Sequence, residues 1–233
     1  MAAVSQSPAV VSERTLTFIK ICGITTWEDA KAAVDAGADA LGFYCGGGGV
    51  RAISLADYWT IASRLSSGVQ QVAVFGGTAS TVPDDWRDAP KHVMERFDHI
   101  QYYDDAIWPQ VIRENWDMRR KIKAFHIVSD RDLRAVAAHN GLVQNILLNV
   151  NACAPISYRD SEAYGWELVR EARQFGKKIY LAGGLTPQTV ARAIARVQPY
   201  FVDVNVGVES EPGVKDPAAM RAFVNAVRAQ DRR

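Results

Sequence analysis

Short apolar runs alternate along the chain with longer stretches in which apolar and polar residues follow a helical period. The short runs predict buried strands, and the periodic stretches between them predict amphipathic helices. The predicted strands cover residues 18–22, 40–44, 71–75, 99–103, 121–126, 145–149, 178–182 and 200–205. The predicted helices cover residues 26–36, 54–65, 107–114, 130–139, 162–175, 187–197 and 217–228, with one further helix between residues 84 and 96.

Eight strand–helix units in succession predict a parallel sheet that is covered by helices. An open doubly wound sheet would be built from the same units. Eight of them in 233 residues, with no linker between them, favour a single (β/α)8 TIM barrel. We therefore predict one barrel domain over residues 16–233, and we expect residues 1–15, which are rich in Ala, Ser and Val, to form a disordered leader.

Composition excludes several classes of function. The 27 basic and 26 acidic residues are spread along the chain, so we expect no charged surface that binds nucleic acid or an anionic membrane. No apolar run approaches the roughly 20 residues that span a bilayer. The three cysteines lack the spacing of a zinc site and are too few for a disulfide framework. We therefore expect a cytoplasmic protein without a bound metal.

Two glycine motifs lie at the ends of the last two strands. Gly183 and Gly184 follow the seventh strand, and Asn205, Val206 and Gly207 lie at the end of the eighth. In a barrel, the loops after these two strands commonly hold phosphate. Glycines let backbone N–H groups approach an anion closely. The expected ligand is therefore a small phosphorylated or carboxylated metabolite.

Several sequence blocks closely resemble phosphoribosylanthranilate isomerase of tryptophan biosynthesis. They read KICGIT at residues 20–25, ADALGF at 38–43, LAGGLTP at 181–187, DVNVGVE at 203–209 and GVKD at 213–216. The resemblance covers nearly the whole chain after Phe18. It implies an Amadori rearrangement without a cofactor, in which a general acid opens a phosphoribosylamine ring by protonating its oxygen. A general base then removes the proton on C2′, and a 1-deoxyribulose phosphate is formed.

The resemblance also implies roles for individual residues. Cys22 matches the family's general base in the KICG motif, and Arg51 matches the arginine that holds the anthranilate carboxylate. The planar guanidinium suits that task, because it can bind a carboxylate through two hydrogen bonds. Gln101, Tyr103 and Asp203 are expected to contact the substrate. Proteins of this kind are monomers or homodimers, and the sequence leaves both open.

The chain departs from the family at the general acid. The family has an aspartate at the end of the sixth strand, where this chain has Asn149. An amide has no titratable proton to give at neutral pH. His126, at the end of the fifth strand, is a candidate replacement, and strand alternation decides whether it points into the barrel mouth or toward the helices. Tyr103 and Asp104 are further candidates.

Other departures surround the predicted site. The loops at residues 44–49, 101–104 and 150–158 all differ from the family pattern, which predicts a reshaped pocket for the aromatic part of the substrate. Lys20 and Lys123 lie in strands and could reach the barrel interior. A solvated or barrel-filling lysine stem is the simpler expectation for both.

Three functions therefore remain open. The chain could catalyse the family reaction with a relocated acid, or it could be a divergent enzyme that acts on another phosphorylated or aromatic carboxylate substrate. It could also be a protein that binds the ligand without catalysis, because a fold does not fix a function. The thiol of Cys22 speaks against the third, since a binding protein has no evident need for it.

Overall fold

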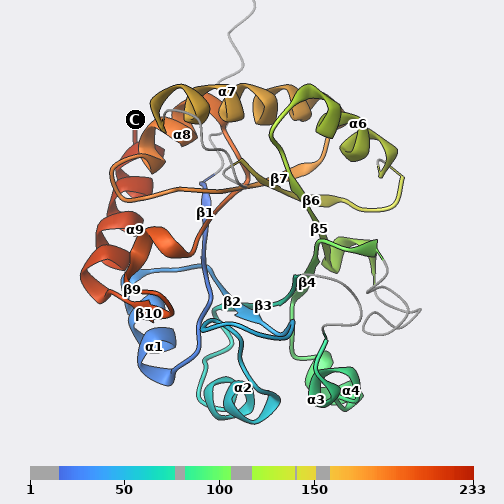
Figure 1. Ribbon diagram of the computed structural model, residues 1–233. Helices are drawn as coiled ribbons and strands as arrows, with labels where there is room; N and C mark the ends of the chain where they lie inside the picture. The colour runs from blue at the N-terminus through green and yellow to red at the C-terminus, as the bar shows by residue number, and fades with distance from the viewer. Residues whose placement is uncertain (1–15, 77–81, 106–116, 140, 151–157) are drawn as a thin grey trace, which may run out of the picture.

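Eight parallel strands form a closed barrel (Figure 1). The computed structural model describes residues 16–76, 82–105, 117–139, 141–150 and 158–233. The strands follow one another around the barrel in chain order, and β8 closes it by pairing with β1. They are β1 (Phe18–Cys22), β2 (Ala40–Tyr44), β3 (Gln70–Phe75), β4 (His99–Tyr102), β5 (Lys121–His126), β6 (Asn145–Asn149), β7 (Lys178–Ala182) and β8 (Phe201–Val204). The predicted (β/α)8 barrel is confirmed.

The helices surround the barrel on its outside (Figure 1). They are α1 (Trp27–Ala36), α2 (Leu55–Ala62), α3 (Asp84–Arg87), α4 (Lys91–Met94), α6 (Asp130–Ala138), α7 (Tyr158–Glu171), α8 (Val190–Val197) and α9 (Pro217–Asp231). Short 3-10 helices occur at Met118–Arg120, Ala172–Phe175 and Val206–Val208. A small antiparallel pair, β9 (Glu209–Glu211) and β10 (Val214–Lys215), follows β8. The predicted helix at 107–114 and the leader at 1–15 lie outside the described residues.

Several predicted helices differ from the structure in their bounds: the helix expected over residues 162–175 is α7, Tyr158–Glu171, followed by a 3-10 helix, and α2 ends at Ala62 instead of residue 65. The single helix expected between residues 84 and 96 is two short helices, because Pro90 ends the first and caps the second. The helix expected from residue 187 begins only at Val190. The backbone N–H of Thr186 donates to the Thr189 hydroxyl at 2.9 Å, so a side-chain-stabilised turn precedes the helix.

Strand alternation divides the buried side chains into two layers. Residues such as Ile19 and Ile21 face the helices and belong to the larger cluster. Those that face inward fill the barrel, among them Cys22, Ala124 and Leu147.

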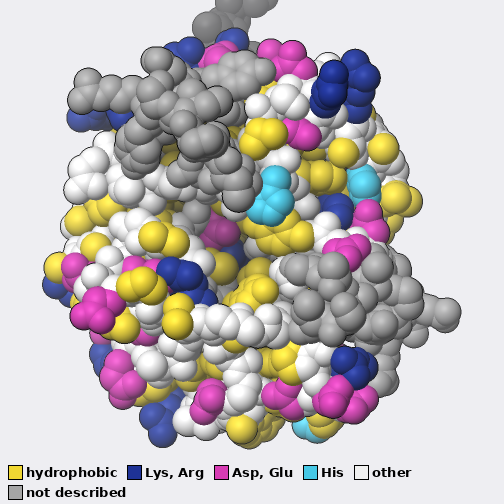
Figure 2. Space-filling view, in the orientation of Figure 1, with side chains coloured by type: hydrophobic (Ala, Val, Ile, Leu, Met, Phe, Trp, Pro, Cys, Tyr) yellow, Lys and Arg dark blue, Asp and Glu magenta, His cyan; other side chains and the backbone are white. Residues whose placement is uncertain are grey.

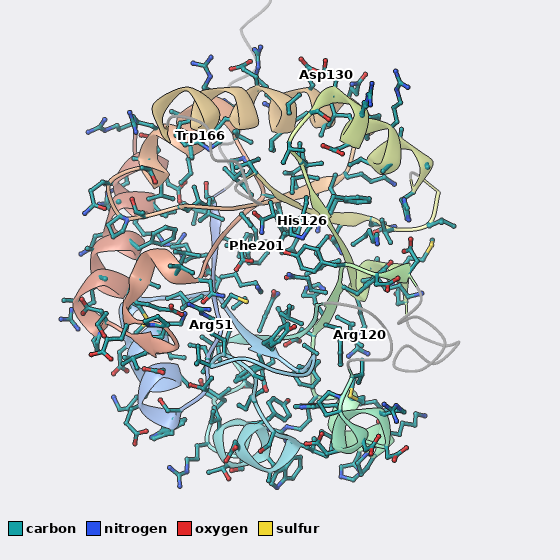
Figure 3. The ribbon with its side chains drawn as sticks, in the orientation of Figure 1. Arg51, Arg120, His126, Asp130, Trp166 and Phe201 are labelled. Carbon is teal, nitrogen blue, oxygen red and sulfur yellow. The ribbon has the colours of Figure 1, made fainter. Side chains whose placement is uncertain are left out.

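An aromatic layer lies at the amino-terminal end of the barrel. The rings of Tyr180 and Phe201 stack with centroids 4.3 Å apart, and Phe18 stacks on Phe201 at 5.1 Å. Phe201 lies at the centre of the barrel in Figure 3. Because these rings fill the amino-terminal end, the interior opens toward the carboxyl ends of the strands.

Candidate functional site

A cavity of about 660 Å³ lies at the carboxyl ends of the strands. Figure 2 shows this face of the molecule hollowed at its centre. The cavity brings together the predicted site residues except His126 and Asp104. These residues are Cys22, Arg51, Gln101, Tyr103, Asn149, Gly183, Gly184, Asp203, Asn205, Val206 and Gly207.

Cys22 ends β1 with its side chain inside the barrel, next to a buried ion pair. The Nζ of Lys20 lies 2.9 Å from Oδ1 of Asp203, and the lysine side chain is fully buried. The sulfur of Cys22 and Nζ of Lys20 lie 2.8 and 2.9 Å from the point where a Cβ at Gly42 would stand. Glycine at position 42 therefore provides the space for the thiol and the ammonium group.

The ion pair shapes the chemistry of the thiol. Burial raises the pKa of Cys22, and the positive charge of Lys20 opposes that rise. Burial alone would lower the pKa of Lys20, but the carboxylate of Asp203 outweighs it, so this pKa lies above its usual value. A thiolate at Cys22 would therefore form next to a permanent cation. The simpler expectation for Lys20, a solvated or barrel-filling stem, does not include this role, although the spacing of two residues from Cys22 places both side chains on one face of the strand.

Lys123 has a different environment from that of Lys20. Its side chain is buried, and its Nζ forms an ion pair with Asp105 at 3.1 Å. It also donates a hydrogen bond to the backbone oxygen of Tyr103. Phe125, two residues further along β5, belongs to the layer that faces the helices. Lys123 therefore lies on the outer side of the barrel and supports the end of β4 from there.

Arg51 lies on the loop after β2 and is held by a carboxylate of the protein. Its Nε and Nη2 atoms donate to the two carboxylate oxygens of Glu209, at 2.9 and 2.7 Å. Lys215 donates to the same carboxylate and to the side-chain oxygen of Asn205, each at 2.8 Å. Burial would raise the pKa of Glu209, but these two cations hold it at about 2. The loops after β2 and β8 are thus joined by one buried charge cluster, which the sequence did not predict.

Replacing Glu209 with glutamine is expected to lower the free energy of unfolding at neutral pH by about 3 kcal/mol, because breaking a buried ion pair from one side has a cost of this order. Because the pKa of Glu209 is depressed, its ionised carboxylate stabilises the fold fully at pH values above the carboxyl pKa of the unfolded chain. This stabilisation is lost as the pH falls toward about 2. Urea unfolding at pH values of about 7 and 3 checks this, because the variant should lose less stability on acidification than the parent. Glu171→Gln, at an exposed position, is the matched control. Equal stability losses in the two variants would contradict the role of the cluster.

The two glycine loops pack directly against each other. Gly183 and Gly184 have φ values of 100° and 65°, a left-handed conformation that glycine adopts without strain. A Cβ at Gly207 would stand 1.9 Å from the backbone oxygen of Leu185, so only glycine permits this contact. The side chain of Val206 is 65% exposed. The glycines therefore fix how the two loops pack against each other, and α8 begins further along the chain than predicted.

Asn149 and Tyr103 meet on the opposite wall of the cavity. The Nδ2 of Asn149 donates to the Tyr103 hydroxyl at 3.5 Å. Burial raises the pKa of Tyr103 to about 12, and the hydrogen bond from Asn149 opposes the rise. Gln101, from the same strand end, is 2% exposed. Its Oε1 atom has no hydrogen-bond partner among the described residues.

His126 lies at the rim rather than in the cavity. It shares the inward face of β5 with Ala124, so strand alternation directs it to the barrel mouth. Its ring stacks on that of Tyr103 with centroids 4.7 Å apart and planes at 22°. Partial burial lowers its pKa, which favours the neutral imidazole. Figure 3 shows His126 and Arg51 on opposite sides of the barrel opening.

Two features are absent from the described residues. These residues contain no group of three or more His, Cys, Asp or Glu side chains placed to hold a metal ion. Within the same part of the chain, none of the helices combines the length and the apolar character that crossing a membrane requires.

The closed barrel and the cavity at its carboxyl end define a (β/α)8-barrel protein with a cavity in the place where barrel enzymes hold their ligands. The chain belongs to the N-(5′-phosphoribosyl)anthranilate (PRA) isomerase family, whose family model matches residues 19–226. The N-(5′-phosphoribosyl)anthranilate isomerase of Pseudomonas fluorescens (strain Pf0-1) is 37% identical over 209 residues, which cover 90% of this chain and 97% of that relative.

Solved structures agree with this membership. The crystal structure of phosphoribosyl anthranilate isomerase from Thermotoga maritima has a TM-score of 0.75 at 29% identity, and the match covers 92% of this chain and 100% of that one. A phosphoribosyl anthranilate isomerase in complex with reduced 1-(o-carboxyphenylamino)-1-deoxyribulose 5-phosphate has a TM-score of 0.73 at 28% identity, with the same coverage.

Proposed function

We propose that the protein is a phosphoribosylanthranilate isomerase. It would convert N-(5′-phosphoribosyl)anthranilate to 1-(o-carboxyphenylamino)-1-deoxyribulose 5-phosphate by an Amadori rearrangement. Family membership over residues 19–226 carries this proposal. The volume of the cavity, about 660 Å³, supports it, because small-metabolite sites have volumes of this order.

In this proposal the two glycine loops bind the phosphate and Arg51 binds the anthranilate carboxylate. Glu209 accepts hydrogen bonds from two of the five guanidinium N–H groups. The remaining N–H groups can donate to the carboxylate of the substrate. The Glu209 contact also fixes the plane of the guanidinium before the substrate arrives, which lowers the cost of ordering it. Gln101 and Asp203, which both line the cavity, would bind hydroxyl groups of the sugar.

Cys22 would be the base that removes the proton from C2′. The thiolate is the reactive form of cysteine, and burial disfavours it in the free protein. Ring opening gives a positively charged iminium group, and an opposite charge nearby favours the ionised form of a group. Together with Lys20, the intermediate would therefore promote the thiolate at the step that needs it.

A divergent enzyme is the second candidate, and the amide at Asn149 favours it. Asn149 stands where the resemblance places the family's catalytic aspartate, and loss of a proton-transfer group commonly costs 10²–10⁴-fold in rate. The same barrel, thiol and glycine loops could then serve another phosphorylated aromatic carboxylate.

The test is turnover of phosphoribosylanthranilate by the purified protein, followed by chromatography of the product. Formation of the 1-deoxyribulose phosphate supports the isomerase. If the protein binds the reduced product analogue but does not turn over phosphoribosylanthranilate, rearrangement of another phosphorylated amine would support the divergent enzyme. If the protein rearranges no phosphorylated amine, the result would support a binding protein without catalysis.

Gly207→Ala is expected to raise the KM for phosphoribosylanthranilate by about tenfold or more and to leave kcat less affected. The added Cβ would stand 1.9 Å from the Leu185 oxygen, so the loops must separate, and overpacking of this kind costs about 1–3 kcal/mol. Gly68→Ala is the matched control, because a Cβ there meets nothing within 4 Å. Steady-state kinetics and the affinity for inorganic phosphate measure the effect. An unchanged KM in Gly207→Ala would rule out these loops as the phosphate site.

A further inference from the structure

The proposed reaction needs a proton donor for the ring oxygen, and Asn149 cannot supply one at neutral pH. We propose that the hydroxyl of Tyr103 is the general acid. This inference rests on the proposed function and assigns the role that the family's aspartate would otherwise have. Three observations carry it: the set of ionisable groups that line the cavity, the direction of one hydrogen bond, and the stacking of one ring.

The ionisable groups exclude most alternatives. Among the described residues, those that line the cavity are Cys22, Tyr44, Arg51, Tyr103 and Asp203. The cysteine has the role of base, and a guanidinium does not release its proton in proteins. The carboxylate of Asp203 is engaged in the buried ion pair with Lys20, at 2.9 Å. Two tyrosines remain.

The position of Tyr103 distinguishes it from Tyr44. The hydroxyl of Tyr103 lies 3.5 Å from Nδ2 of Asn149, the residue that replaces the family's acid. Tyr44 ends β2, beside the strand that carries the base, and its ring packs over Gly46 and Gly76. Of the two tyrosines, Tyr103 is therefore the one placed to donate a proton on the side of the substrate away from Cys22.

The hydrogen bond with Asn149 gives the phenol its direction. The amide donates and the phenolic oxygen accepts, so the hydroxyl proton is not used in this bond and can be directed at a ligand in the cavity. The stacked ring of His126 fixes the plane of the phenol. Because burial raises the pKa of Tyr103 to about 12, the phenol keeps its proton throughout the neutral range.

The proton transfers balance over the whole reaction. The O–H bond of Tyr103 breaks and its proton passes to the ring oxygen as the C1′–O bond breaks, while the lone pair of the substrate nitrogen forms a C1′=N bond. The Cys22 thiolate takes the C2′ proton, which leaves a neutral enaminol. The enol O–H then returns a proton to the tyrosinate, and the cysteine thiol gives its proton to C1′. Both side chains end in their starting states, and no co-reactant is required.

The experiment compares the parent with Tyr103→Phe, which keeps the ring that stacks on His126 and removes only the hydroxyl. We expect kcat for phosphoribosylanthranilate to fall by about 10²–10⁴-fold, with KM changed by less. Asn149→Asp in the Tyr103→Phe background should restore turnover, because it returns a carboxyl to the adjacent position. Tyr200→Phe, at the amino-terminal end of the barrel, is the matched control for the loss of a tyrosine hydroxyl and should behave as the parent.

The possible outcomes distinguish a failure of the proposed role of Tyr103 from a failure of the proposed isomerase function. A parent that turns over while Tyr103→Phe is equally active overturns the inference and leaves the proposed function standing. A large loss in His126→Gln or Tyr44→Phe, with Tyr103→Phe active, overturns it in favour of that side chain. A parent without turnover overturns the proposed function, and the inference falls with it. Loss in Tyr103→Phe together with rescue by Asn149→Asp supports both.

Discussion

Replacing Cys22 with alanine is expected to lower kcat for phosphoribosylanthranilate by at least 10²-fold and by up to about 10⁴-fold, the usual contribution of a proton-transfer group. The side chain is small and lies beside the space left by Gly42, so the fold should tolerate the change. Cys22→Ser is the sharper test of a thiolate base, because it nearly keeps the size of the side chain and replaces the thiol with a hydroxyl, which is a far weaker acid. Both should bind the reduced product analogue with nearly the affinity of the parent.

The pH dependence of the parent gives the same test without a mutation. Since burial raises the pKa of Cys22 and Lys20 only partly offsets it, most of the thiol is protonated at neutral pH in the free protein. The value of kcat/KM should therefore rise with pH through the alkaline range, as the thiolate forms. Cys45→Ala serves as the control for loss of a buried thiol, because Cys45 is also a free buried cysteine and does not line the cavity. A parent whose kcat/KM does not change from about pH 7 to 9 would contradict a thiolate base.

Most of the barrel could be predicted from the sequence because each strand is a short apolar run between longer amphipathic stretches. Alternation predicts that Cys22 and Ile21 lie on opposite faces of β1, and the structure shows that Cys22 is the one inside. Helix boundaries were harder to predict. They depend on local hydrogen bonds such as that between Thr186 and Thr189, which compete with the helix and leave no periodic signal.

The charge clusters of the site could not be predicted in the same way. Arg51 and Glu209 are 158 positions apart in the sequence, and no local pattern relates them. Lys20 and Asp203 are paired in register only because β8 closes the barrel on β1. The residue types at the strand ends can be predicted from the sequence, whereas barrel closure determines which of them become partners. For His126, alternation alone leaves both directions open, and the inward position of Ala124 in the structure decides for the barrel mouth. The stacking on Tyr103 at the rim depends on the neighbouring strand.

Lys20→Met is expected to lower the free energy of unfolding by about 3–5 kcal/mol, the usual cost of breaking a buried ion pair from one side. The side chain of Lys20 is fully buried and that of Asp203 is 8% exposed, so the carboxylate that remains has little water to replace its partner. Lys31→Met is the matched control, because Lys31 and Asp35 form an ion pair in which both side chains are about 60% exposed. Exposed pairs contribute about 0–1 kcal/mol. Urea unfolding at neutral pH measures both variants.

A double variant, Lys20→Met with Asp203→Asn, distinguishes two contributions to the loss of stability: the lost attraction between the two side chains and the cost of leaving the Asp203 carboxylate buried without a partner. Removing the charge of Asp203 should recover part of the stability, because most of the cost of the single variant is the desolvated carboxylate. The double variant should still be a poor enzyme, since the thiolate of Cys22 has lost the cation that favours it. Equal losses in Lys20→Met and Lys31→Met would mean that the buried pair does not stabilise the fold. Stability and the ionisation of Cys22 depend on the same ammonium group, so a change at Lys20 must alter both.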